Sequence, residues 1–351
     1  MPKTNRYLVD FDPENPPSPN AGYFGMNLSP EQAEVIVLPV PFEATVSYRR
    51  GTKDGPETIR KASHQLDFFD RSLGKPYLLG ISTLGGSWLE QCAAWNDEAS
   101  ALVEQLRNES LSDSTQQELR TRVNDICRQV HDGVKTHVDH WGRQEKLVMV
   151  VGGDHSIAYG SIAAVAEREG EIGVLQFDAH ADLRVAYEGF QWSHASIMDN
   201  IMETVPGVKK LVSVGVRDFC ESEYNAIEKA HGRIEAFYAE DVREAQWKGE
   251  NFAELCVRIV EALPEKVYIS FDVDGLDPTL CPSTGTPVPG GLLFEEVSFL
   301  LKTVFRSGRR IVGLDLCEVA PGPNGDEWDG NVGARILYKL MGYALKSQGK
   351  C

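Results

Sequence analysis

The sequence lacks the features of a disulfide-stapled, secreted or membrane-spanning protein. Its seven cysteines are odd in number, scattered and without a CxxC pair, which argues against a disulfide framework and a structural zinc site. The polar, proline-rich start has no apolar segment of the kind that a signal peptide requires. No apolar run approaches the roughly 18 residues of a membrane-spanning helix. We therefore expect a protein of a reducing compartment, the cytoplasm, that does not enter a membrane.

Positive charge is also scarce. The chain has 35 lysines and arginines against 52 aspartates and glutamates, a formal net charge of −17. A surface this negative repels phosphate backbones, and no basic cluster offsets it. Nucleic acid is therefore not an expected partner, whereas a small cationic ligand is compatible with the charge.

Strands and helices are predicted to alternate along most of the 351 residues. Apolar, β-branched runs predict strands at 35–40, 147–151, 172–177, 211–216, 267–271 and 311–316. Helical spacing predicts helices from about residue 56 and at 161–169, 196–205, 225–232, 251–262, 294–307 and 332–345. This alternation is typical of an α/β protein with right-handed crossovers and a parallel sheet that is covered on both faces.

Two segments do not fit this alternation. Residues 1–30 form a polar N-terminal arm with several prolines. Residues 88–141 have helical apolar spacing throughout, and Ser-Asp-Ser at 112–114 predicts a break and a helix cap. We interpret this second segment as two consecutive helices.

Acids and histidines gather where the predicted strands end. Asp154 and His155 follow one strand, DAHAD (178–182) and DVD (272–274) follow two others, and Glu318 follows a fourth. In open parallel sheets, ligand sites lie beyond the carboxyl ends of the strands. Alternate residues of an extended chain face the same side, so each motif would present its acids together if the chain stays extended.

So many unpaired carboxylates would repel one another, and divalent cations would resolve the repulsion. Two imidazoles and four carboxylates are too many for one tetrahedral zinc ion but suit two ions that share bridging carboxylates. Mn²⁺ fits this oxygen-rich set best, and Fe, Co, Ni and Zn stay open. The predicted metal ligands are His155, Asp178, His180, Asp182, Asp272 and Asp274.

At this point the motifs resemble a known family. GGDHS (152–156), DAHAD (178–182) and SFDVDGLDP (270–278) are similar to the three signatures of the ureohydrolases, which include arginases and agmatinases. The resemblance continues through 47–60, 281–292 and 313–321 and covers most of residues 35–345. It implies a three-layer α/β/α sandwich with a mostly parallel sheet of about eight strands. It also implies one catalytic domain over 31–351, with 88–141 as a helical insertion, and assembly into a homo-oligomer, a trimer or a hexamer.

The resemblance further implies a division of roles. One Mn²⁺ would be held by His155, Asp178, Asp182 and Asp272, and a second by His180, Asp178, Asp272 and Asp274. A metal-bridging hydroxide would attack the guanidinium carbon and release urea and an amine. The catalytic residues would be Asp182, which orients the hydroxide, His194, which shuttles protons, and Glu318, which pairs with the substrate guanidinium. Asp277 is interpreted as a former of the following turn.

The identity of the guanidino substrate is less defined by the sequence. Residues 178–196 resemble agmatinases, because Arg184 replaces an asparagine that is usual in arginases, whereas 214–223 resembles arginases, with Cys220 in place of an acid. Arg184 could bind a substrate carboxylate or pair with Glu188. Agmatine is favoured, and L-arginine or another guanidino acid is the alternative. The expected substrate-binding residues are Arg184, Asp218, Glu223, Thr286 and Glu318.

Two other classes of function stay open. A mononuclear zinc deacetylase of related fold would leave His155 and Asp274 without a role, and a non-catalytic metal-binding protein would need no Glu318. A serine hydrolase is not indicated, because no GxSxG motif follows a strand.

Overall fold

Eight parallel strands form the central sheet of the computed structural model, which describes residues 4–9, 11–107 and 110–351. The sheet order is β2-β1-β3-β8-β7-β4-β5-β6. All strand pairs in the described part of the chain are parallel. The strands are β1 Val35–Val40, β2 Ile81–Thr83, β3 Leu147–Gly152, β4 Ile172–Phe177, β5 Val208–Val214, β6 Ile234–Phe237, β7 Lys266–Asp272 and β8 Arg310–Cys317.

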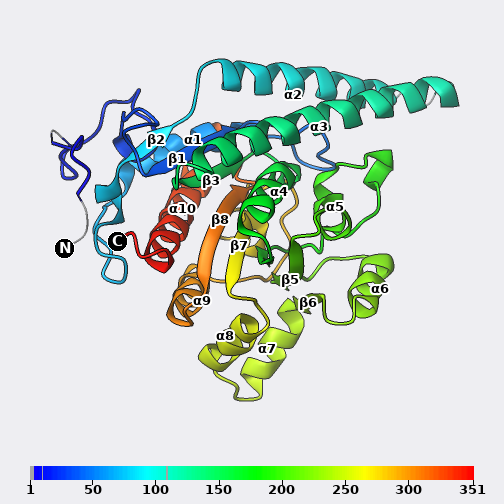
Figure 1. The fold of residues 1–351 in the computed structure, drawn as a ribbon. Helices are drawn as coiled ribbons and strands as arrows, with labels where there is room; N and C mark the ends of the chain where they lie inside the picture. Colours follow the sequence, from blue (N-terminus) through cyan, green and yellow to red (C-terminus); the bar gives the residue numbers. More distant parts are fainter. Residues whose placement is uncertain (1–3, 10, 108–109) are drawn as a thin grey trace.

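The helices cover both faces of this sheet and make the predicted three-layer sandwich (Figure 1). One layer contains α1 Gly55–Ala62, α7 Ala239–Trp247, α8 Phe252–Glu261, α9 Phe294–Arg306 and α10 Trp328–Ser347. The other contains α2 Ser87–Leu106, α3 Asp113–Gly142, α4 Ala158–Glu169, α5 Ile197–Thr204 and α6 Glu221–Lys229. No described helix combines the length and the apolar composition needed to cross a bilayer.

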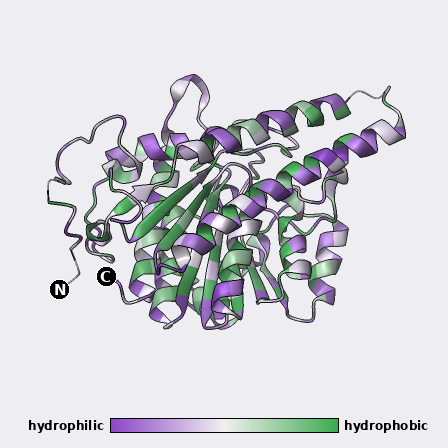
Figure 2. Ribbon diagram, turned by 45° about the horizontal axis from the view of Figure 1, so that its top comes forward, coloured by the Kyte–Doolittle hydropathy of each residue, from purple (hydrophilic) through white to green (hydrophobic). Residues whose placement is uncertain are grey.

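The strands are apolar on both faces because each face has its own core. Val35 and Val37 of β1 pack with the layer of α10, whereas Ile36 and Leu38 pack with the layer of α3. Figure 2 shows the strands as a largely hydrophobic centre, with helices that are hydrophilic on their outer sides. Burial on both faces explains why these strands appear in the sequence as continuous apolar runs.

The predicted strands and helices are present, and the structure adds three elements that the sequence analysis missed. β2 has three residues, β6 has four, and α7 follows directly after β6. Strands this short carry too few residues for a clear apolar period. The sequence analysis therefore detected six of the eight strands.

Helices α2 and α3 are the two helices predicted within 88–141. Ser112 caps α3, because its hydroxyl accepts a hydrogen bond from the Thr115 N–H at 3.2 Å. The two helices run side by side along one edge of the molecule and extend beyond it (Figures 1 and 2). On the N-terminal side, the region predicted as an arm ends in a turn, Tyr23–Gly25, in which Phe24 is fully buried and packs against Tyr338.

A buried histidine packs α3 against its neighbour α4 in the same layer. His131 is 2% exposed, lies against the rings of Tyr159 and Trp192, and its ring nitrogens find no hydrogen-bond partner in the described parts of the chain. Burial lowers its pKa to about 3. Because the charged ring is excluded from this site, the native state holds His131 neutral.

This burial predicts a loss of stability in acid. The folded pKa of His131 lies below the ordinary histidine value, so the unfolded chain takes up the proton first and stability falls as the pH drops below about 6.5. The loss should be about 1.4 kcal/mol per pH unit from pH 6 to pH 4. The free energy of unfolding, measured by denaturant titration at several pH values, should fall more steeply with acid in the wild type than in His131→Phe, by this amount per pH unit. His140→Gln, on the exposed side of α3, should keep the wild-type pH dependence.

Candidate metal centre

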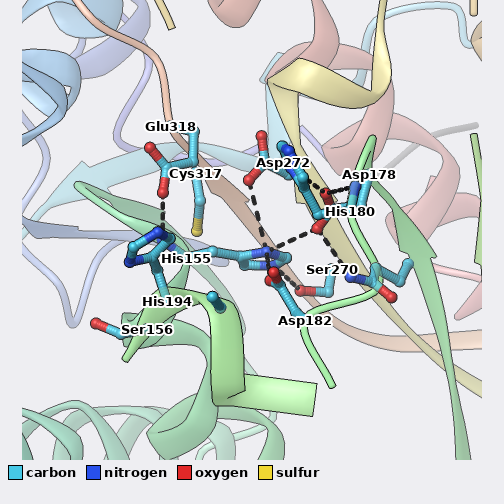
Figure 3. A network of polar contacts seen from close by, with 12 residues as sticks. His155, Ser156, Asp178, His180, Asp182, His194, Ser270, Asp272, Cys317 and Glu318 are labelled. Atoms are coloured by element: carbon cyan, nitrogen blue, oxygen red, sulfur yellow. Dashed lines mark hydrogen bonds and ion pairs between the residues drawn. The ribbon is translucent and has the colours of Figure 1, made fainter. Parts of the chain in front are cut away.

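The strand ends that carry the predicted ligands lie next to one another. β3, β8, β7 and β4 are consecutive in the sheet, so their carboxyl ends form one edge at its centre. Gly153 makes the approach of the first loop possible, because a Cβ at this position would lie 1.9 Å from the Phe42 carbonyl oxygen. Figure 3 shows the histidines and carboxylates of these strand ends pointing toward one another.

The predicted ligands divide into two groups that share Asp178. In the first group, His155 Nδ1 lies 3.1 Å from Asp178 Oδ2, 3.0 Å from Asp182 Oδ2 and 3.6 Å from Asp272 Oδ2. In the second, His180 Nδ1 lies 2.9 Å from Asp274 Oδ2 and 3.6 Å from Asp178 Oδ1. Each group contains three ligand atoms that one ion could bind together.

The chain reaches this arrangement through turns and not through extended strands. Asp182 has a φ of 55° in the left-handed region, and Val273–Gly275 form a 3-10 turn that Asp272 caps. The condition that the two motifs stay extended is therefore not met throughout, although the acids of DAHAD and DVD do converge. Non-glycine residues with positive φ are costly and cluster at functional sites.

The electrostatics of the cluster favour a cation. Burial and the neighbouring Asp178 raise the pKa of Asp182 to about 7. Although burial opposes it, Asp274 and Asp178 raise the pKa of His180 to about 12. The protein alone thus retains protons among these carboxylates, and divalent ions would replace that positive charge.

One orphaned atom supports the same conclusion. His155 Nδ1 is buried and makes no well-aligned hydrogen bond within the described residues, although carboxylate oxygens surround it. A nitrogen that donates to none of its acidic neighbours fits a lone pair that faces a metal ion. The residues present therefore fit a metal centre.

Glu318 lies beside this cluster and is buried, with a φ of 66°. Its Oε1 accepts a hydrogen bond from the His155 N–H at 2.9 Å. Burial, with Asp154 nearby, raises its pKa well above the ordinary glutamate value. A buried carboxylate without a positive partner is a natural site for a planar cation.

A cavity of about 170 Å³ opens above the cluster. Its walls include every predicted catalytic and substrate-binding residue and four of the six predicted metal ligands, His155, His180, Asp182 and Asp272. Asp277 is outside it and forms the predicted turn, accepting hydrogen bonds from Thr279. The sequence analysis missed three lining residues, because no motif marked them: Ser47, Tyr187 and Ala195.

Within this cavity Arg184 is already paired. Its Nε lies 3.6 Å from Glu223 Oε2, and its guanidinium stacks over the Tyr187 ring at 4.8 Å from the centroid. Glu223 is buried and also accepts hydrogen bonds from the N–H groups of Leu183 and Cys220. Among the described residues the ionic partner of Arg184 is thus Glu223 and not Glu188, which corrects one of the two expectations for it.

The arginase family model matches residues 33–342. The chain belongs to the arginase family. Among its curated relatives is an N(1)-aminopropylagmatine ureohydrolase of Synechocystis sp., 32% identical over 322 residues that cover 91% of each chain.

Solved structures of this family share the fold. The agmatine ureohydrolase of Thermoplasma volcanium is 25% identical, with a TM-score of 0.70 over 92% of this chain and 94% of the other. The arginase of Bacillus caldovelox is 23% identical, with a TM-score of 0.65 over 88% of this chain and 97% of the other. The predicted arginase-like fold is confirmed.

Proposed function

We propose that this arginase-family protein hydrolyses the guanidino group of an agmatine-type cationic substrate to urea and an amine. The observation that carries the proposal is one cavity in which a two-part cluster of predicted metal ligands adjoins Glu318, a buried carboxylate without an ion-pair partner among the described residues. The names of similar proteins, an N(1)-aminopropylagmatine ureohydrolase and an agmatine ureohydrolase, support it.

The metal centre would hold two divalent ions, for which we propose Mn²⁺. His155, Asp178, Asp182 and Asp272 would bind one ion, and His180, Asp178, Asp272 and Asp274 the other. When bound, the pair of ions would lower the pKa of a shared water toward neutrality and so supply the nucleophile. Thr286 supports the second group, because its hydroxyl donates a hydrogen bond to Asp274 Oδ2 at 3.3 Å.

The protein's own residues would position the substrate and move protons. Glu318 would hold the guanidinium by a bidentate pair, with the carbon facing the ligand cluster. Asp182 would orient the nucleophile by a hydrogen bond. Burial, with His180 and His155 nearby, lowers the pKa of His194 to about 4. The ring is therefore neutral near pH 7, and a proton that it receives during the reaction would be passed on readily to the leaving amine.

Arg184 argues against a substrate carboxylate. Its charge is engaged by Glu223 and by the Tyr187 ring, so binding a carboxylate would require breaking that pair. Asp218 also lines the cavity, and its side chain is 69% exposed, so the wall that it forms carries a negative charge near the solvent. This wall fits the terminal amine of agmatine or N(1)-aminopropylagmatine better than the amino acid end of L-arginine.

A urea assay tests the substrate. With Mn²⁺ added, kcat/KM for agmatine and N(1)-aminopropylagmatine should exceed that for L-arginine at least tenfold, which corresponds to about 1.4 kcal/mol of transition-state stabilisation. Guanidinobutyrate and guanidinopropionate, which end in a carboxylate, should be poor substrates. Faster urea release from L-arginine would overturn the substrate assignment.

Metal content and product, measured on the same samples, distinguish the alternative classes of function. Two ions per chain with urea release supports a ureohydrolase, whereas one ion with deacetylation of an acylated amine would support the zinc deacetylase. Bound metal without turnover of any substrate would support a non-catalytic protein. We also propose a cytoplasmic location, which the seven free cysteines support, and a trimeric or hexameric assembly.

A further inference from the structure

Two polar residues lie directly behind the metal centre and are not among its predicted ligands. Ser270 of β7 and Asp315 of β8 are paired in the register of the sheet and are completely buried. Ser270 Oγ lies 3.0 Å and 3.1 Å from the two carboxylate oxygens of Asp315. Because side chains alternate along a strand, Ser270 shares the face of Asp272, and Asp315 shares that of Cys317.

His155 connects this pair to the ligand cluster. Its Nε2 lies 2.8 Å from Ser270 Oγ, whereas its other ring nitrogen, Nδ1, faces carboxylates, among them Asp182 Oδ2 at 3.0 Å. The three groups form a chain from a carboxylate, through a hydroxyl, to an imidazole that points at the metal centre.

The direction of these hydrogen bonds follows from the chemistry of the groups. An ionised carboxylate only accepts, and Asp315 accepts from the Ser270 hydroxyl and from the Phe271 N–H at 3.2 Å. Because the Ser270 hydroxyl donates its only hydrogen to Asp315, its oxygen must accept a hydrogen bond from the Nε2–H of His155. The lone pair of the His155 ring is then on Nδ1.

A different reading of the same groups is a separate metal site, because His155, Asp315 and Cys317 also offer three ligand atoms within reach of one ion. Two contacts oppose it. Ser270 Oγ already occupies the hydrogen-bonding position of Nε2, and the Cys317 thiol is directed at Asp315 Oδ1 at 3.6 Å. The side chains of His155, Ser270, Asp315 and Cys317 therefore find their hydrogen-bond partners among themselves, without an ion.

Within the part of the chain that the structure describes, the second histidine has no comparable hydrogen-bond support. His180 Nε2 faces Asp218 Oδ2 at 4.0 Å, beyond hydrogen-bond distance, and Asp218 is largely exposed. The two groups of predicted ligands thus differ. The His155 imidazole is fixed by a buried chain of hydrogen bonds, whereas the His180 imidazole faces the solvent-exposed side chain of Asp218.

We propose that Ser270 and Asp315 are positioning residues that fix the tautomer and orientation of His155 and so tighten the ion site to which His155 belongs. This inference rests on the proposed two-ion function. The His155 site should be the tighter of the two in the wild type, because only its histidine has a buried hydrogen-bond chain behind it. Groups that orient metal-binding histidines typically contribute about 10- to 100-fold in metal affinity.

Titration of the chelator-stripped full-length protein with Mn²⁺, with free Mn²⁺ followed by electron paramagnetic resonance, tests the inference. The wild type should bind two ions with different affinities. Ser270→Ala and Asp315→Asn should weaken the tighter ion about 10- to 100-fold and change the other less than about threefold. The matched control is Ser63→Ala, a fully buried serine that bonds the Arg60 carbonyl and the Phe24 N–H far from the centre.

The outcomes distinguish this inference from the function on which it rests. Unchanged affinities in both variants would overturn the positioning role and leave the two-ion function intact. Equal weakening of both ions, with a fall in the Tm of the metal-free protein beyond that of Ser63→Ala, would show a merely structural role. A third wild-type ion that is lost in Asp315→Asn would make Asp315 a ligand. A wild type that binds no ion and releases no urea would instead refute the proposed function.

Discussion

Asp272→Ala should abolish urea release from every guanidino substrate. Asp272 is one of the two residues, with Asp178, that we propose would bind both ions; it is buried, and its Oδ2 lies 3.6 Å from His155 Nδ1. Its Oδ1 also accepts the Asp274 N–H at 2.8 Å, so its removal disturbs the turn that carries another ligand. Loss of a shared ligand removes the activation of water by both ions, and we expect kcat to fall at least about 1,000-fold.

The control for this variant lies five residues further along the chain. Asp277→Asn changes a carboxylate that only forms a turn with Thr279 outside the cavity, and it should keep near wild-type kcat and two bound ions. Urea release should be measured at saturating Mn²⁺ together with metal content per chain. Near-normal turnover by Asp272→Ala would mean that the chemistry takes place elsewhere.

Glu318→Gln should separate substrate binding from metal binding. Glutamine keeps the size of the side chain and an oxygen that can accept the His155 N–H, so both ions should still bind. It removes the buried negative charge that we propose pairs with the substrate guanidinium. Loss of one partner from a buried charge pair costs about 2–5 kcal/mol, so kcat/KM should fall about 30- to 4,000-fold.

Three measurements define this result: kcat/KM for agmatine, Mn²⁺ stoichiometry and Tm. The expected pattern is a large loss of kcat/KM with two ions retained and a Tm equal to or above that of the wild type, because an uncompensated buried carboxylate is removed. A kcat/KM within about threefold of the wild type would exclude the proposed guanidinium contact. Loss of an ion would instead assign Glu318 to the metal centre.

The place of the metal centre was predictable because a parallel sheet sends the carboxyl ends of its strands to one edge. GGDHS, DAHAD and DVD each follow a strand, and this was enough to predict that His155, Asp178 and Asp272 meet. The backbone path was not predictable: Asp182 reaches the cluster in a left-handed conformation. The alternation of side chains along an extended chain thus predicted the correct neighbouring side chains, although the backbone does not stay extended there.

The ion-pair and hydrogen-bond partners of individual charged residues could not be predicted from the sequence either. Arg184 had two plausible roles from its neighbours in the chain, and the structure pairs it with Glu223 at the start of α6. Ser270 and Asp315 are 45 residues apart and meet only because β7 and β8 are paired in one register. Sheet register and loop packing depend on contacts between distant segments, which periodicity within one segment does not contain.

By itself, the sequence determined the order of six of the eight strands and of most helices, the set of predicted metal ligands and the edge of the sheet at which they gather. These follow from apolar periodicity and from the residues that end each strand, which are local properties of the chain. Only the tertiary structure decided which charges are paired, which are buried and which nitrogen of His155 faces the carboxylates. Those properties depend on distances of a few ångströms and on exclusion of water, and both arise when segments far apart in the chain pack together.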